Sequence, residues 1–201
     1  MYNYETRKLT FQFVPEHSWY KNLHNFTPRW NEISEKIRET NKCEICGKET
    51  HDLDAHEVWT YNDITHTQSL DNIIAVCKDC HNTIHIGHAN ITGKTKEAIA
   101  QYKKVNQLTD AEINKDYNEA VSVWEIRSGY EWTIDEEQIK QKVYEQTGIK
   151  CDMDINGKYY VNISYAEKEK AKQYGAKWDW QRKMWYFTDM ESRNNWSNRV
   201  R

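Results

Sequence analysis

The sequence predicts an α+β protein with a cysteine-rich core, helical flanks and a small carboxy-terminal βαββ domain. Two C-x2-C pairs enclose segments with the alternating apolar residues of strands. Apolar residues at helical spacing follow, and a strand, a helix and a hairpin can be traced in the last 45 residues. The expected segments are residues 1–41 (an N-terminal segment and a helix that pack on the core), 42–93 (the core), 94–150 (a helical extension) and 157–201 (the small domain).

The composition excludes several classes of protein. The 201 residues carry a formal net charge of −3 and contain no apolar run near 18 residues, so no transmembrane span is expected. The start, Met1-Tyr2-Asn3-Tyr4, lacks the basic and apolar regions of a signal peptide. Four of the five cysteines form pairs and Cys151 stands alone, so disulfides are not expected. These features predict a cytoplasmic protein without a membrane partner.

The two cysteine pairs predict a zinc site. Cys43 and Cys46 form the first pair, and Cys77 and Cys80 form the second, with 30 residues between the pairs. Each pair presents two soft ligands from one tight turn, and four such ligands complete a tetrahedral zinc site. Gly47 suits the backbone of the first turn. Because four thiolates leave no open position, the zinc is expected to be structural.

The remaining pattern predicts the secondary structure. The expected elements of the first part are a strand at 9–14, a helix at 28–40, strands at 53–55 and 73–76, and a helix at 80–88. Those of the second part are helices at 96–106, 109–127 and 135–146, a strand at 159–163, a helix at 166–174, and a hairpin of 178–180 with 184–187. The residues expected to cover the core are Val14, Trp19, Tyr20 and Leu23.

The order of motifs in residues 42–88 resembles the zinc-knuckle HNH endonucleases. The first C-x2-C pair is followed by His56-Glu57 after a strand, by Asn72 before the second pair, and then by Cys80-His81-x3-His85. The flanks at Val14-Pro15, Trp19, Asn22-Leu23 and 123–132 also look like those of a bacterial and phage HNH subfamily. The resemblance implies a treble-clef-like ββα-metal core that clamps one catalytic divalent cation.

The resemblance also implies roles for individual residues. His56, His81 and His85 would hold the catalytic Mg²⁺, Mn²⁺ or Ni²⁺, and on a helix His81 and His85 share one face. Hydrolysis of a phosphodiester needs this cation and a base that deprotonates water. Asn72 matches the asparagine that orients the base strand, and Glu57 takes the base position.

Glu57 departs from the family pattern, which has histidine at the base position. A glutamate with its ordinary pKa of about 4.3 is a weak base unless burial raises that pKa. Three interpretations follow: Glu57 is the base, His66 in the following loop replaces it, or hydrolysis is lost.

The carboxy-terminal residues predict contact with a polyanion. Residues 157–201 hold ten Lys and Arg against five acids, whereas the first 156 residues hold 18 against 26. Ten aromatic residues among them suit base stacking, although Trp178, Trp185 and Tyr186 are expected to form the small core. The hairpin residues expected to contact nucleic acid are Lys177, Arg182 and Lys183. This segment resembles a module appended to phage and plasmid DNA-metabolism proteins, including conjugative-plasmid primases.

Together these features lead us to expect a metal-dependent HNH-type endonuclease that hydrolyses phosphodiester bonds in DNA, with RNA as an alternative partner. It is expected to be bacterial or phage-encoded and located in the cytoplasm. The alternative is a catalytically inactive HNH-like zinc module that binds nucleic acid or a protein partner. A third interpretation is a platform for protein contacts in phage–host conflict. Glu57 in place of histidine is the best support for the inactive module.

Overall fold

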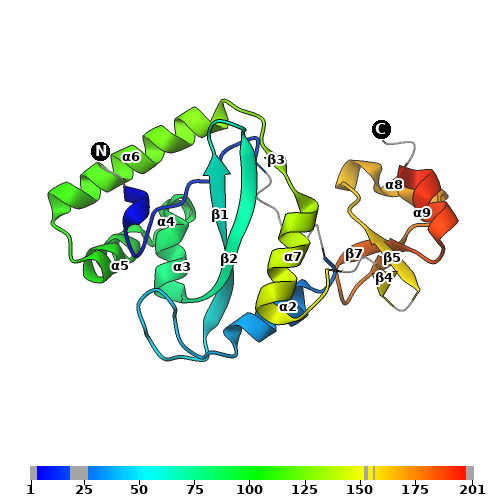
Figure 1. Ribbon diagram of the computed structural model, residues 1–201, viewed down its shortest axis with the longest axis horizontal. Coiled ribbons are helices and arrows are strands. Elements are labelled where there is room, and N and C mark those ends of the chain that lie inside the picture. Colours follow the sequence, from blue (N-terminus) through cyan, green and yellow to red (C-terminus); the bar gives the residue numbers. More distant parts are fainter. Residues whose placement is uncertain (1–3, 19–26, 152–153, 156, 198–201) are drawn as a thin grey trace. The chain divides into compact units, whose positions relative to one another are not determined.

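The computed structural model describes residues 4–18, 27–151, 154–155 and 157–197 (Figure 1). It mixes helices and strands, in agreement with the α+β class. Two compact units are present: the first unit comprises residues 1–20 and 34–142, and the second unit comprises 21–33 and 143–201. The expected packing residues Trp19, Tyr20 and Leu23, and the flank residue Asn22, lie outside the described residues.

A long antiparallel hairpin is the centre of the first unit. Strand β1 (Leu53–Asn62) pairs with β2 (Thr67–Cys77) over its whole length, with a register shift between Val58 and Trp59. Strand β1 extends beyond its predicted segment because the residues that follow, Val58-Trp59-Thr60-Tyr61, are β-branched or aromatic. Strand β2 begins earlier than predicted, where its residues 67–72 pair with this extension of β1. A short strand that the sequence did not reveal, β3 (Thr133–Ile134), runs parallel to the start of β2.

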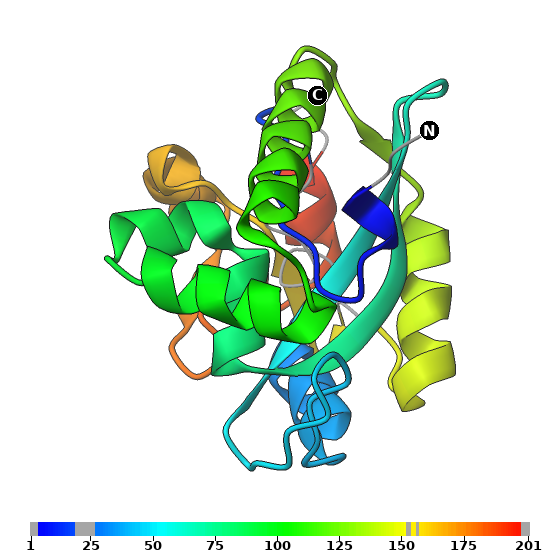
Figure 2. The same cartoon turned by 90° about the vertical axis from the view of Figure 1, so that its left-hand side faces the viewer.

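Helices flank both sides of this hairpin. The helices on one side are α3 (Lys78–Ile84), α4 (Ile86–Ile91), α5 (Thr95–Asn106) and α6 (Asp110–Ser128), and the first half of α7 (Glu136–Thr147) lies on the other side (Figures 1 and 2). Gln138 of α7 bonds both the backbone N–H and the carbonyl of Leu70 in β2. The predicted capping box is confirmed, since Thr109 and Glu112 bond each other's backbone N–H.

The helix predicted at residues 80–88 is interrupted. It divides into α3 and α4 at His85, whose φ of −91° and ψ of 51° are not helical. The backbone N–H of His85 still donates to the carbonyl of His81 at 3.1 Å, so the two residues remain hydrogen-bonded as in a helix. The helix predicted at 28–40 is confirmed as α2 (Trp30–Arg38).

The strand predicted at residues 9–14 is wrong. A short 3-10 helix, η1 (Tyr4–Thr6), is followed by a segment without regular structure. Its backbone groups bond to helices instead of a sheet: Asn106 bonds both the N–H and the carbonyl of Leu9, and the carbonyl of Ile84 accepts from Gln12. Phe11 is fully buried and stacks on Tyr102 with ring centroids 3.9 Å apart. The alternating apolar residues therefore reflect burial under helices.

The second unit contains a four-stranded sheet in the order β4-β5-β7-β6. Its elements are β4 (Asp154–Ile155), β5 (Lys158–Val161), η2 (Tyr165–Glu167), α8 (Lys168–Gln173), β6 (Lys177–Asp179), β7 (Met184–Phe187) and α9 (Met190–Ser197). The βαββ pattern is confirmed, with β4 and α9 added. The buried core consists of Val161, Ile163, Ala171, Ala176, Phe187 and Trp196. Trp178, Trp185 and Tyr186, which were expected to form this core, are only half-buried.

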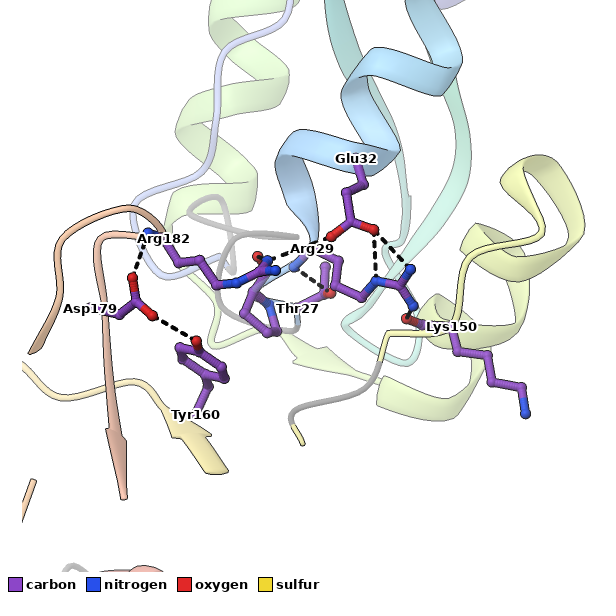
Figure 3. A network of polar contacts seen from close by, with 8 residues as sticks. Thr27, Arg29, Glu32, Lys150, Tyr160, Asp179 and Arg182 are labelled. Carbon is purple, nitrogen blue, oxygen red and sulfur yellow. Dashed lines mark hydrogen bonds and ion pairs between the residues drawn. The ribbon is translucent and has the colours of Figure 1, made fainter. Parts of the chain in front are cut away.

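Asp179 fixes the turn between β6 and β7. Its carboxylate accepts from Lys158 Nζ at 2.8 Å and from the backbone N–H of Gln181. It also accepts from the Tyr160 hydroxyl at 2.8 Å and from the backbone N–H of Arg182 (Figure 3). The hydrogen bond from Lys158 is the main reason why the pKa of this carboxyl lies well below its usual range. Only 10% of the side chain is exposed, so the charge is held inside the unit.

We predict that Asp179→Asn destabilises the second unit by about 1–3 kcal/mol, because an amide loses the charge-assisted bonds. A lowered pKa in the folded state stabilises the fold above the unfolded-state pKa of about 3.9, and this contribution is lost as the pH falls below that value. Urea unfolding at pH 7 and pH 3 should therefore show a smaller acid effect in the variant than in the wild type. The control is Glu191→Gln at an exposed position; equal unfolding midpoints for all three proteins would contradict the prediction.

Candidate metal centres

The four paired cysteines converge in the first unit. Cys43 and Cys46 lie in the turn before β1, Cys77 ends β2, and Cys80 lies in α3. Their sulfur atoms are all within 4.8 Å of one another, and those of Cys46 and Cys77 are 3.7 Å apart. Gly47 has a φ of +77°, as the tight turn requires, and its N–H donates to the carbonyl of Cys43 at 2.8 Å. The cluster can therefore hold a metal ion such as zinc.

The surroundings of these sulfurs suit a cation. Burial raises the pKa of the Cys77 and Cys80 thiols. At Cys43 burial opposes ionisation, but backbone N–H groups led by that of Cys46 outweigh it and lower the pKa to about 7. Gln101 of α5 donates to the Cys80 sulfur at 3.2 Å. Buried thiols are ionised when a metal binds them, and N–H donors then stabilise the sulfur charge.

Three histidines form a second cluster. His56 comes from β1, His81 from α3, and His85 from the break between α3 and α4. One ring nitrogen of each lies within 4.8 Å of those of the other two, and the ring centroids are 4.8–5.4 Å apart. We call these residues the histidine triad. The structure thus brings together the three residues that the resemblance assigned to one cation.

The rings of His56 and His85 favour the neutral form. Only 3% of His56 is exposed, and burial, with help from His85 and His81, places its pKa well below the usual value. Burial is also the main cause that lowers the pKa of His85 to about 4, followed by His81 and His88. Neutral imidazole is the form that binds metal, so burial prepares these rings as ligands.

Two residues that the sequence did not single out hold the triad in place. Asp54 Oδ2 lies 2.8 Å from His81 Nδ1, and Lys78 Nζ donates to the other carboxylate oxygen. Gln12 Oε1 lies 3.2 Å from His56 Nε2. Asp54 precedes His56 by two residues, so the alternation of a strand places both on one face, and this signal could have found it. Nothing local marks Gln12, which comes from the irregular N-terminal segment.

We predict that Asp54→Asn weakens the affinity of the histidine triad for a divalent cation by about 10–100-fold, because a carboxylate behind a ligating histidine fixes its orientation and raises its basicity. Isothermal titration with Mn²⁺ measures this affinity. Asp52→Asn is a matched control, since Asp52 also faces Lys78 but its side chain is 74% exposed. Equal affinities of the two variants would show that Asp54 does not support the triad.

The remaining predicted catalytic residues also lie on the hairpin. Glu57 pairs with Ile73, and it lines a cavity of about 490 Å³ together with His56 and His85. Asn72 pairs with Val58 at the register shift, and its Oδ1 accepts from the N–H of Ile73 at 3.0 Å.

His66 is not brought near the triad. It precedes β2 at the tip of the hairpin, where it stacks on Tyr130 with centroids 4.1 Å apart. His56 pairs with Ile74, which lies far along β2, so the strand rise places His66 about 20 Å away. The interpretation of His66 as a replacement base is therefore wrong.

The three predicted nucleic-acid contacts have different environments. Lys177 on β6 and Lys183 in the β6–β7 turn are exposed. Arg182 is 26% exposed and donates to the carbonyl of Pro28 at 2.8 Å, with Glu32 at 3.6 Å (Figure 3). Arg182 is thus engaged inside the second unit, whereas the two lysines remain predicted contacts.

A family model described as a domain of unknown function (DUF5710) matches residues 158–198. The match covers most of the second unit's sheet and helices, and no HNH endonuclease family is matched. No curated protein matches the chain, and no solved structure matches it. Among the described residues, no helix is both long and apolar enough to cross a membrane.

Proposed function

We propose that this chain is a metal-dependent HNH-type endonuclease that hydrolyses phosphodiester bonds in DNA. The observation that supports it best is the convergence of three imidazoles beside a separate four-cysteine cluster. A hairpin and the helix after it carry all three histidines, which is the arrangement that the resemblance implies. Two clusters with different ligands favour two metals with different roles.

The two clusters suit different roles: the four-cysteine cluster a structural one and the histidine triad a catalytic one. The four cysteines would hold zinc and join the first turn to the start of α3. The histidine triad supplies three ligands, which leaves positions open to substrate, as in catalytic sites. Imidazole ligands favour Ni²⁺, whereas Mg²⁺ and Mn²⁺ prefer oxygen ligands. A divalent cation bound there would supply positive charge to the phosphate oxygens.

The protein residues would supply the proton transfer. In this proposal the Glu57 carboxylate accepts a proton from the attacking water. Asp54 keeps His81 oriented through the bond at Nδ1, and Asn72 supports the hairpin backbone at the register shift. The shared cavity of Glu57, His56 and His85 supports the placement of base and ligands around one substrate.

A nicking assay tests the proposed function. Supercoiled plasmid is incubated with the zinc-loaded full chain and Mg²⁺, Mn²⁺ or Ni²⁺, or with no added cation. We expect nicked circles only when a cation is added, none with His81→Ala, and wild-type nicking with the control His88→Ala at an exposed position on α4. If folded, zinc-loaded protein cleaves neither plasmid DNA nor a structured RNA with any of the cations, the endonuclease proposal fails.

The second candidate is the inactive zinc module that binds nucleic acid or a protein partner. It is favoured by the position of Glu57, which is adjacent to His56 on β1. Neighbouring residues of a strand start from opposite faces, so Glu57 and His56 leave β1 on different faces although both line the cavity. This candidate predicts tight zinc binding, no cleavage, and no change of partner binding with Glu57→Gln.

A further inference from the structure

We propose that the second unit binds single-stranded nucleic acid on a row of three tryptophans at the β6–β7 hairpin. The row consists of Trp180, Trp178 and Trp185, and we call it the tryptophan row. The inference concerns binding and goes beyond hydrolysis at the histidine triad, so neither depends on the other.

The three rings follow one another from the turn into the sheet. Trp178 on β6 pairs directly with Trp185 on β7, and their ring centroids are 5.2 Å apart at an interplanar angle of 65°. Trp180 at the start of the turn lies 6.3 Å from Trp178 with an interplanar angle of 85°. Trp185 packs against the core of the unit. The row is therefore fixed at one end and open to solvent at the other.

Trp180 is the residue of the tryptophan row that a binding partner would cover. Its side chain is 85% exposed, whereas Trp178 and Trp185 are half-buried. The core of this unit is formed by other residues, so Trp180 contributes little to its packing. A single exposed apolar residue is common on protein surfaces. An exposed indole ring at the end of a row of aromatic rings, however, offers a surface on which a base can stack.

The charges around the row fit phosphate groups. Lys172 of α8 lies 5.9 Å from the centre of the Trp185 ring, and Lys183 is exposed in the turn that Trp180 begins. The acidic residue of this hairpin, Asp179, already accepts hydrogen bonds from Lys158 and Tyr160. Residues 158–198 hold eight Lys and Arg against five acids. The surface therefore combines aromatic rings with excess positive charge.

Single-stranded nucleic acid is the polyanion that fits this combination of aromatic rings and positive charge. Stacking on a side chain requires a base whose flat face is free, and in a duplex the neighbouring base pairs cover that face. Basic groups beside the rings would then contact the backbone phosphates. Recognition of this kind tolerates any base, so we expect similar affinity for oligothymidylate and for mixed sequence.

Fluorescence anisotropy with labelled 20-nucleotide single strands tests the inference. The full chain is used without added divalent cation, so the result does not depend on nuclease activity. We expect Trp180→Ala to weaken binding about 5- to 150-fold, Trp180→Tyr to restore most of it, and Met190→Ala, an exposed apolar control in the same unit, to leave it unchanged. Lys183→Glu should reduce the salt dependence of binding.

Two results would overturn the proposal. One is wild-type affinity of Trp180→Ala, with a melting temperature equal to that of the wild type as evidence of folding. The other is tighter binding of a duplex than of either of its single strands. Because Trp180 is 85% exposed, its replacement should not unfold the unit, so loss of binding would report on the surface itself.

Discussion

Replacement of Cys80 by alanine is expected to abolish zinc binding at the four-cysteine cluster and to destabilise the first unit by several kcal/mol. Structural zinc contributes about 10–16 kcal/mol of apparent binding energy in zinc-finger peptides, as much as the whole stability of many domains. Cys80 is fully buried, and its sulfur lies among the three other thiols. Zinc content after dialysis against a weak chelator, and the melting temperature by circular dichroism, measure the two effects.

Cys151→Ala is the matched control for this experiment. Cys151 is also a buried cysteine, 6% exposed, but it lies in the second unit outside the four-cysteine cluster. The control should keep the same zinc content as the wild type. A Cys80→Ala protein that retains its zinc, or a wild type that never holds zinc, would contradict the assignment.

Glu57→Gln is expected to lower the rate of plasmid nicking by about 10²–10⁴-fold, the range attributed to a positioned general base. Glutamine has nearly the same shape as glutamate but cannot accept the proton from water. The affinity for Mn²⁺ should remain unchanged because Glu57 is not one of the triad. Initial nicking rates and Mn²⁺ titration of the same preparation measure the two quantities.

Glu49→Gln, at an exposed position in the cysteine turn, is the control for Glu57. It should nick at the wild-type rate. If Glu57→Gln also nicks at that rate while His81→Ala does not, Glu57 is not the base. If Glu57→Gln loses Mn²⁺ affinity, the carboxylate acts as a ligand instead.

The local features of the fold could be predicted from the sequence. The cysteine spacing identified the four-cysteine cluster, and the spacing of His81 and His85 placed both on one helical turn. The capping box at Thr109 marked the start of α6. Each C-x2-C pair, the two histidines and the capping box lie within a few residues, so local geometry determines them, and the need of zinc for four ligands joins the two pairs.

Features that depend on distant residues could not be predicted. The segment around Leu9 lost its predicted strand because Asn106, 97 residues away, binds its backbone. Arg182 was expected at a nucleic-acid surface, but it donates to the carbonyl of Pro28, 154 residues away. Gln12 reaches His56 from an irregular segment. Such contacts arise only from the folded chain.

Titration of the zinc-loaded protein with Mn²⁺, followed by electron paramagnetic resonance, examines the second cation site without any assumption about substrate. We predict one bound Mn²⁺ per chain in the wild type and in His88→Ala. His81→Ala and His85→Ala should bind none at the same concentration while they keep their zinc. Absence of bound Mn²⁺ in the wild type, or equal binding by all four proteins, would contradict a catalytic cation at the histidine triad.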